Sequence, residues 1–296
     1  MFDAVAAECA KQQIYVHLDN HVSKAIWCCS TDDGNAWFGD TYFNVANWKR
    51  GLSYMAKHGS SWVNLMSMSL RNELRSPDDN STLASSSYNW ENWYENIVPA
   101  TKAINDANPN VLIFLSGLNF DTDLSLISTG AALGGGYSFQ KSSFSYANKL
   151  VLELHNYATT ATDCSSLESS LYGEGYNALD SSDSSVVNVM PVVMTEFGHL
   201  QDDATYASVY STCLKSFLTS IHGGWMVWVL AGSYYIRQGG QDLDETWGEY
   251  NTFPEYSQKY ILILFTGLLN HDWTSWRDPN GINSVIIPMV SGTKTF

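Results

Sequence analysis

Short apolar runs rich in β-branched and aromatic residues recur along the chain, and polar clusters usually follow them. Their length is typical of strands buried on both faces of a sheet. The runs cover residues 14–18, 62–68, 111–115, 150–154, 191–194 and 225–230. Stretches with helical periodicity lie among them, at residues 1–13, 47–58, 88–107 and 202–221. Because strands alternate with helices, the pattern predicts parallel β-α units.

Local signals mark some of the ends of these elements. Asn89 is a candidate cap for the helix at 88–107, which stops before Asn108 and Pro109. The helix at 202–221 is expected to open at its two aspartates. The serine-rich stretches 81–87 and 181–185 and the three glycines at 134–136 are predicted to be loops.

Two architectures can hold six parallel strands: a doubly wound sheet and a (β/α)₈ barrel, which needs eight. The polar residues that follow the runs favour the barrel, because barrel active sites lie at the carboxyl ends of several strands. These residues are Asp19-Asn20-His21, Asn72-Glu73, His155-Asn156-Tyr157 and Glu196. No GxGxxG motif follows a run, so a nucleotide-binding sheet has little support. We therefore predict an α/β fold of the TIM-barrel class.

Composition and charge narrow the possible partners. The 296 residues include 15 Lys and Arg against 30 Asp and Glu, a net charge of −15. An acidic surface repels phosphate, so we expect no nucleic-acid partner and no binding to anionic membranes. No apolar run is long enough for a membrane span, and the first residues do not resemble a secretory signal. Aromatic residues make up 14% of the chain and suit either sugar stacking or core packing.

Two carboxylates are candidates for acid–base chemistry. Glu73 and Glu196 each lie just past an apolar run, so their carboxyl groups can meet at one rim of a barrel. Hydrolysis of a glycosidic bond needs such a pair, one acid to protonate the leaving oxygen and one to attack or to activate water. The alternative is that each acid belongs to a buried salt bridge, with Arg71 and Arg75 near Glu73.

Other constellations receive less support. His17 and His21 are four residues apart, a spacing that could suggest a metal site. The two side chains share a face only if the strand continues past Leu18, and no third or fourth metal ligand follows at a recognisable spacing. His17 is expected to be a core histidine. We predict no metal and no cofactor. A serine-hydrolase triad is disfavoured because Ser69 and Ser116 lie in no nucleophile elbow. Trp27 is either a sugar-stacking wall or packing, and the tryptophans at 37, 48, 62, 90 and 93 are expected to be mainly packing.

Six ordered motifs resemble glycoside hydrolase family five, the cellulase family of clan A, in its fungal-type members. They resemble the third to eighth barrel strands of that family, and together they cover most of residues 1–248. In chain order they are IYVHLDNHVSKAIWCCS (14–30), SMSLRNELRSP (67–77), NPNVLIFLSG (108–117), LVLELHNYATT (150–160), PVVMTEFGH (191–199) and WMVWVLAGSYYIRQG (225–239).

The resemblance implies roles for individual residues. Glu73 matches the acid/base and Glu196 the nucleophile, while Asn72 matches the asparagine that hydrogen-bonds the sugar 2-hydroxyl. The remaining matches shape the catalytic subsite, and they are His21, His155, Tyr157 and Trp228. Of these, Tyr157 is expected to hold Glu196 by a hydrogen bond, and Trp228 to form a sugar platform. Members of the clan retain anomeric configuration, which implies two carboxyl groups about 5–5.5 Å apart.

The sequence departs from the family in two places. Met1 falls where the family has the helix after its second strand, so the resemblance implies that the first two strands and an arginine on the second are missing. The segment 249–266 interrupts the pattern between DETWG (244–248) and GLLNHDWTSWRDP (267–279), and we suspect an insertion there. We expect residues 1–296 to form a single catalytic barrel domain that is incomplete at its N-terminus.

The expected function is hydrolysis of a β-linked glucan, foremost as an endo-β-1,4-glucanase, by a retaining double displacement. β-1,3-Glucan, mannan and glycosphingolipid substrates remain open. One alternative is a catalytically inactive, sugar-binding remnant of the same family. A weaker one is a barrel enzyme that uses two acids with a metal, such as an isomerase or amidohydrolase. The resemblance further implies a polysaccharide or oligosaccharide partner, an extracellular location and a monomer.

Overall fold

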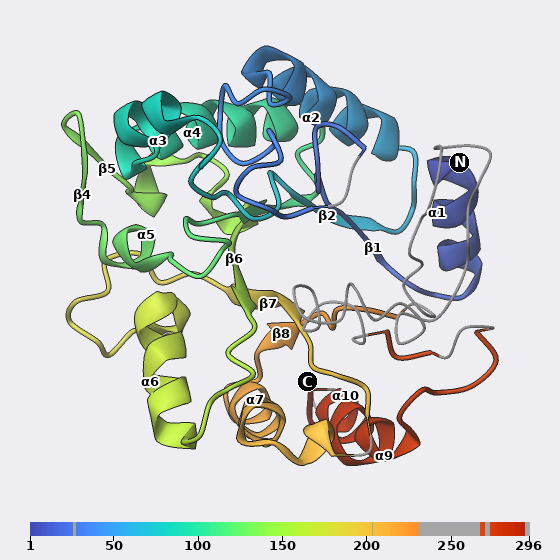
Figure 1. Cartoon of the computed structure of the whole chain (residues 1–296). Coiled ribbons are helices and arrows are strands. Elements are labelled where there is room, and N and C mark those ends of the chain that lie inside the picture. Colours follow the sequence, from blue (N-terminus) through green and yellow to red (C-terminus); the bar gives the residue numbers. More distant parts are fainter. Residues whose placement is uncertain (26–27, 203, 231–266, 270–272, 294–296) are drawn as a thin grey trace. The chain divides into compact units, whose positions relative to one another are not determined.

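The structure is a computed structural model that describes residues 1–25, 28–202, 204–230, 267–269 and 273–293 (Figure 1). The chain forms two compact units. The first comprises residues 1–154 and 172–192, and the second comprises residues 155–171 and 193–296. The suspected insertion at 249–266 lies outside the described residues.

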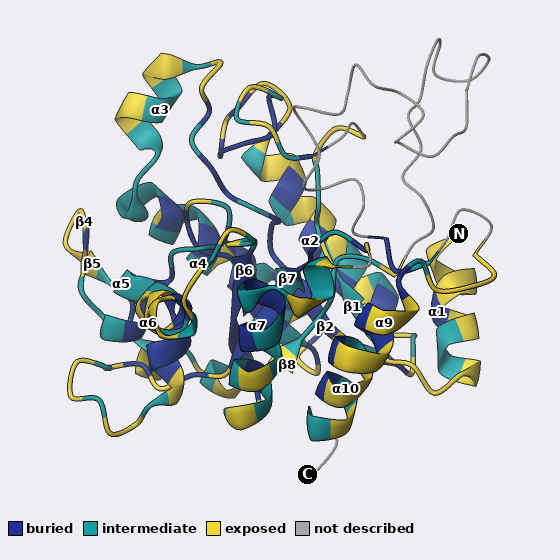
Figure 2. Cartoon of the chain, turned by 60° about the horizontal axis from the view of Figure 1, so that its bottom comes forward, coloured by how far each residue is buried: buried dark blue, intermediate teal, exposed yellow. Residues whose placement is uncertain are grey.

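Four parallel strands form the centre of the first unit. In their order across the sheet they are β1 (Val16–Leu18), β2 (Leu65–Ser69), β3 (Leu112–Leu115) and β6 (Leu150–Asn156), which belongs to this unit as far as Leu154. All seven residues of β6 are buried, as its dark ribbon in Figure 2 shows. The prediction of strands buried on both faces is therefore confirmed for β6.

Two long helices of the first unit, α2 (Val45–Gly59) and α4 (Trp90–Ala107), lie side by side (Figure 1). Each anchors to the end of a strand through a buried tryptophan. The indole of Trp48 donates to the carbonyl of Leu70 at 2.8 Å, and that of Trp93 donates to the carbonyl of Ser116 at 2.8 Å. These two tryptophans are packing residues, as expected. The predicted cap is also present, since the Asn89 side chain accepts from the amide of Asn92.

The remaining elements of the first unit are α1 (Phe2–Lys11), α3 (Ser81–Ser87), α5 (Ser125–Thr129) and the hairpin of β4 (Ala132–Gly134) and β5 (Tyr137–Ser138). The glycines at 134–136 all have positive φ and form the turn of this hairpin. The prediction that 81–87 is a loop is wrong. Asn80 caps a helix there by accepting from the amide of Leu83, and the hydroxyls of Ser85, Ser86 and Ser87 donate to carbonyls of the same helix.

The second unit contains most of β7 (Val192–Phe197) and a short parallel neighbour, β8 (Gly224–Trp225). Its helices are α7 (Val209–Ser220), α9 (Pro279–Gly281), α10 (Ile287–Thr293) and the greater part of α6 (Cys164–Glu174). A disulfide between Cys164 and Cys213 links α6 to α7. Among the described residues, shorter helical turns lie at Lys141–Ser143, Ala147–Lys149, Tyr176–Leu179, Thr205–Ala207 and Ile282–Ile286.

Two predictions for the second unit need correction. The helix expected at 202–221 begins only at Val209, because Asp202 accepts from the amides of Ala204 and Thr205 and closes a separate turn. Ser208 then caps α7. The strand expected at 225–230 is also shorter. After β8 the pairing with the β7 region continues only as single hydrogen bonds, from the amide of Met226 to Met194 and from that of Trp228 to Phe197.

The described residues thus contain six parallel strands that match the six predicted runs in chain order. The antiparallel hairpin is additional. Among the described helices, none is both long and apolar enough to cross a membrane. The expectation of one catalytic domain over residues 1–296 stays a prediction.

Candidate functional site

The segment after β2 carries the predicted acid/base in a defined backbone conformation. Glu73 has a φ of 48°, in the left-handed region that non-glycine residues seldom adopt. Its amide donates to the carboxylate of the buried Asp121 at 2.7 Å, and the amide of Asn72 donates to the carbonyl of Asn20 at 3.2 Å. Backbone strain of this kind is concentrated at functional sites, where surrounding contacts maintain it.

Two buried arginines hold this segment. Arg75 donates to the Glu73 carbonyl at 2.8 Å and forms an ion pair with Asp33 at 2.6 Å. Arg71 donates to the side chains of Asn20 and Ser23 and to the carbonyl of Asn35. Burial lowers the pKa of Arg71 to about 10, so it stays protonated at neutral pH. In the described part of the chain, neither arginine forms an ion pair with the Glu73 carboxylate, so the structure does not support the alternative of a salt bridge to these arginines.

Asn72 lies against a pair of sulfur atoms. Its side-chain amide donates to Sγ of Cys28 at 3.5 Å and to Sγ of Cys29 at 3.3 Å, and these neighbouring cysteines are joined by a disulfide. His21 is close by, with Nδ1 2.8 Å from a carboxylate oxygen of Asp19. Ligand atoms of His21 and both cysteines lie within 4.8 Å of one another. Disulfide sulfurs are not thiolates, so in this state they do not form a metal site.

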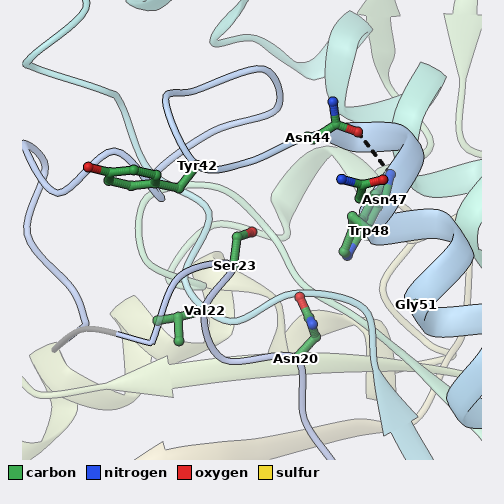
Figure 3. A pocket seen from close by; sticks show the side chains of 8 residues that line it. All are labelled: Asn20, Val22, Ser23, Tyr42, Asn44, Asn47, Trp48 and Gly51. Carbon is green, nitrogen blue, oxygen red and sulfur yellow. Dashed lines mark hydrogen bonds between the residues drawn. The ribbon is translucent and has the colours of Figure 1, made fainter.

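Two pockets of the first unit border the segment that follows β1. One, of about 220 Å³, is shown in Figure 3 and is lined by Asn20, Val22, Ser23, Tyr42, Asn44, Asn47, Trp48 and Gly51. Its walls offer amide and hydroxyl groups beside one tyrosine ring. The other, of about 320 Å³, includes His21 and several apolar residues. Arg71 donates hydrogen bonds to Asn20 and Ser23, two residues that line the first pocket, and so holds their side chains in place.

The second unit places the predicted nucleophile among its predicted neighbours. Glu196 lies near the end of β7 with its side chain 12% exposed. The hydroxyl of Tyr157 donates to Oε2 of Glu196 at 3.0 Å, and Nδ1 of His155 lies 3.8 Å from the same oxygen. The hydrogen bond expected between Tyr157 and Glu196 is therefore present. Trp228 lies in the segment after β8, where its amide donates to the carbonyl of Phe197 at 2.8 Å.

Each unit thus brings part of the predicted set together. The first holds His21, Asn72 and Glu73, and the second holds His155, Tyr157, Trp228 and Glu196. His17 is a hydrogen-bonded, half-buried histidine of β1: its ring nitrogens contact Ser67 and Ser69, as expected for a residue with satisfied polar atoms, and β1 ends at Leu18. The catalytic and binding roles of these residues stay predictions.

Sequence reasoning missed two acids. Asp121, which fixes the Glu73 amide, lies in an irregular loop after β3, and no periodic signal points to it. Glu153 is 2% exposed in the middle of β6. The sequence does contain a signal for this residue: Glu153 is a charged residue inside an otherwise apolar run. Such a side chain is seldom fully buried without polar partners, so its position predicts hydrogen bonds inside the sheet.

Comparison with known proteins identifies the family. The profile of the cellulase family (glycosyl hydrolase family 5) matches residues 1–233. A glycosyl hydrolase 5 family protein of Chamaecyparis obtusa is 32% identical over 293 residues, which are 94% of this chain and 45% of that protein. The chain thus spans less than half the length of this relative.

Solved structures share the fold. A β-glucanase of Saccharophagus degradans superposes with a TM-score of 0.61 at 15% identity, covering 98% of this chain and 72% of that one. It has also been solved with cellotetraose. A hyperthermophilic endocellulase of Pyrococcus horikoshii superposes with a TM-score of 0.64 at 15% identity, covering 99% and 73%. The predicted fold class, a TIM barrel of which the described residues contain six strands, is confirmed. The chain belongs to glycosyl hydrolase family 5, the cellulase family.

Proposed function

We propose that this protein is a glycoside hydrolase that cleaves a β-linked glucan by a retaining double displacement, with Glu196 as nucleophile and Glu73 as acid/base. The observation that carries the proposal is the environment of Glu196. A tyrosine hydroxyl donates to one of its carboxylate oxygens at 3.0 Å, and a histidine nitrogen lies 3.8 Å from the same oxygen. These groups fix the orientation of a carboxylate that has to attack along one direction.

The first chemical step forms a glycosyl ester. The Glu196 carboxylate attacks the anomeric carbon, the bond to the leaving oxygen breaks, and Glu73 gives its proton to that oxygen. In the second step, water attacks the anomeric carbon, and Glu73, now ionised, takes a proton from the water. Glu196 leaves as a carboxylate, and the sugar regains its β configuration. The mechanism requires carboxyl groups about 5–5.5 Å apart.

The other residues of the set would bind the sugar. Asn72 is proposed to hydrogen-bond the 2-hydroxyl, and Trp228 to stack on a sugar face. His21 and His155 would shape the same subsite. The protein's Saccharophagus neighbour, a β-glucanase solved with cellotetraose, and the Pyrococcus endocellulase support a β-1,4-glucan as substrate. β-1,3-Glucan, mannan and glycosphingolipids are the alternatives to test beside it.

Reducing-sugar release from carboxymethyl cellulose and soluble β-glucan tests this function. The purified chain should release reducing ends, and a Glu73→Gln, Glu196→Gln double variant of the same fold should not. Activity in both proteins would mean that residues other than Glu73 and Glu196 catalyse the reaction. A folded wild-type chain without activity on any of the four substrate classes would contradict the proposal.

Removing only the Tyr157 hydroxyl should slow catalysis and leave the fold intact. A hydrogen bond to a charged group contributes about 1.5–3 kcal/mol. Tyr157→Phe is therefore expected to lower kcat by about tenfold to a hundredfold, with a smaller change in KM. Steady-state kinetics on a soluble cello-oligosaccharide measures this. An unchanged kcat would mean that Tyr157 does not hold the nucleophile during the reaction.

A second candidate is a sugar-binding protein without turnover. It is favoured by the described part of the chain, which contributes six parallel strands where the family fold has eight. Calorimetry with cellotetraose separates the two candidates. Binding to wild-type protein without any product would support the second candidate, whereas binding to the double variant together with turnover by the wild type supports the enzyme.

We further propose an extracellular location and a monomeric state. The two disulfides, Cys28–Cys29 and Cys164–Cys213, support the location, because disulfides persist in oxidising compartments. Thiol titration of the denatured native-source protein should then find one reactive thiol, that of Cys9. A count of five thiols would contradict the disulfides. Light scattering in solution tests the monomer.

A further inference from the structure

The amide pocket, which is the cavity of about 220 Å³ in Figure 3, takes part in no step of the proposed mechanism. Two stretches of chain enclose it. The segment after β1 supplies Asn20, Val22 and Ser23, and the start of α2 with the loop before it supplies the other side. All of its lining residues belong to the first unit, so the pocket is a property of that unit alone.

Two buried polar side chains hold the wall that follows β1. Arg71, which is 1% exposed, donates to Oδ1 of Asn20 at 3.2 Å and to Oγ of Ser23 at 3.0 Å. The side-chain oxygen of Asn35, a fully buried residue, accepts from the amides of Ser23 and Lys24, each at 3.1 Å. Because these contacts place the wall before any ligand arrives, binding there costs little ordering of the chain.

The opposite wall is fixed by the start of α2. Oδ1 of Asn44 accepts from the backbone amide of Asn47 and so caps the helix. The indole of the buried Trp48 donates to the carbonyl of Leu70 at 2.8 Å, so it offers the pocket only its ring. The half-exposed ring of Tyr42 is a second aromatic surface at this side. The wall therefore combines amide groups with aromatic rings.

Several polar groups of the pocket are available to a ligand. Within the described residues, the side-chain amide of Asn47 forms no hydrogen bond, and neither do the side-chain nitrogens of Asn20 and Asn44. The hydroxyl of Ser23 accepts from Arg71 and keeps its own proton to donate. An amide both donates and accepts, so the pocket presents neutral groups of both kinds.

We propose that the amide pocket binds one ring of a neutral sugar. Sugar hydroxyls donate and accept, as the amides of the pocket do, and the C–H face of a pyranose packs well on an aromatic ring. A purely apolar ligand would leave the amides unpaired. The volume lies below the roughly 300–1,000 Å³ of pockets for drug-sized ligands, which suits a single ring.

The charges around the pocket also favour a neutral ligand. No lining residue carries a charge. Of the two cations nearby, Arg71 already donates to Asn20, Ser23 and Asn35, and Nζ of Lys24 lies 4.0 Å from the centre of the Tyr42 ring. None of the proposed catalytic and subsite residues lines the pocket, so this inference does not depend on the proposed function.

An NMR titration of the full chain with methyl β-glucoside tests the proposal. The protein is labelled with ¹⁵N-asparagine, and the side-chain amide signals are assigned by single substitutions. Those of Asn44 and Asn47 should shift saturably, with a Kd in the millimolar range that is usual for one small ring. The signal of Asn110, an exposed asparagine that does not line the pocket, should stay in place.

A matched pair of substitutions at Gly51 locates the binding. Gly51 lies in α2 and lines the pocket, and a Cβ added there meets no atom within 4 Å. Gly51→Leu should fill the pocket, whereas Gly51→Ala should leave most of it open. Both replace a glycine inside a helix and should melt at or above the wild-type temperature. The Leu variant should bind the glucoside at least about tenfold more weakly than the Ala variant.

A second pair of variants tests one hydrogen-bonding group without filling the pocket. Asn47→Ala removes an amide from an exposed position of α2 and should weaken binding by about threefold to tenfold, as the loss of one neutral hydrogen bond does. Asn110→Ala is the same substitution outside the pocket and should bind as the wild type does.

Four results would overturn the proposal. They are no saturable shift up to the solubility limit of the glucoside, equal affinity in the Gly51→Leu and Gly51→Ala proteins, equal shifts with the same concentration of glycerol, and tighter binding of glucuronate than of methyl β-glucoside. The last result would assign the pocket to an anion. All of these measurements report binding, so they decide the proposal whether or not the chain hydrolyses glucan.

Discussion

Replacing Glu196 with glutamine is expected to abolish glucan hydrolysis. The amide keeps the size of the carboxylate, and it can still accept the hydrogen bond that the Tyr157 hydroxyl donates at 3.0 Å. It cannot attack the anomeric carbon, so the glycosyl ester does not form. Loss of a nucleophile typically lowers kcat by more than about 10⁴-fold. Initial rates on carboxymethyl cellulose and on a soluble cello-oligosaccharide measure the loss.

A matched control separates lost chemistry from lost fold. Glu95→Gln makes the same change on the exposed side of α4 and should keep the wild-type rate. Both variants should unfold at temperatures close to that of wild type. A Glu196→Gln protein with the wild-type rate would remove Glu196 from the mechanism and contradict the family assignment of the nucleophile.

Replacing Glu73 with glutamine is expected to lower kcat on glucan by about 10²- to 10⁴-fold, the usual contribution of a general acid or base. The loss should depend on the leaving group. With a dinitrophenyl cellobioside as substrate, dinitrophenolate leaves without needing a proton, so the cellobiosyl ester of Glu196 still forms. The ester is then hydrolysed slowly because no base activates water. A rapid burst of dinitrophenol followed by a slow phase is the expected time course.

An added anion makes this prediction more specific. Azide needs no base, so it should react with the accumulated ester and restore the rate of dinitrophenol release from the Glu73→Gln protein. The product should be the β-glycosyl azide. Azide should not restore Glu196→Gln to a β-azide product, because that variant forms no ester. Failure of azide to rescue Glu73→Gln, in a variant that shows the burst, would argue against Glu73 as the base of the second step.

Much of the strand pattern could be predicted from the sequence, since short apolar runs rich in β-branched residues usually form buried strands. The runs at 111–115 and 150–154 coincide with β3 and β6 almost residue for residue. The position of polar residues after the runs then located Glu73, Asn72, His155, Tyr157 and Glu196. The hydrogen bond from Tyr157 to Glu196 followed from the family resemblance, because spacing alone does not show which side chains meet.

Other features depend on contacts that no local pattern encodes. The helix at 81–87 depends on the Asn80 cap and on serine hydroxyls that donate to carbonyls within the helix, in a composition typical of loops. The late start of α7 depends on a competing turn around Asp202. The buried position of Glu153 depends on a contact between strands, since Ser69 of β2, which donates to it, is 84 residues away in sequence.

Proton NMR of cello-oligosaccharide hydrolysis by the purified chain tests the central claim most directly, with the Glu73→Gln, Glu196→Gln protein as the baseline. The two anomers of a new reducing end have separate signals before mutarotation mixes them. Our account predicts that the β-anomer appears first, and only with the wild-type protein. An α-anomer appearing first, or no hydrolysis by a folded wild-type chain, would contradict a retaining mechanism built on this pair of glutamates.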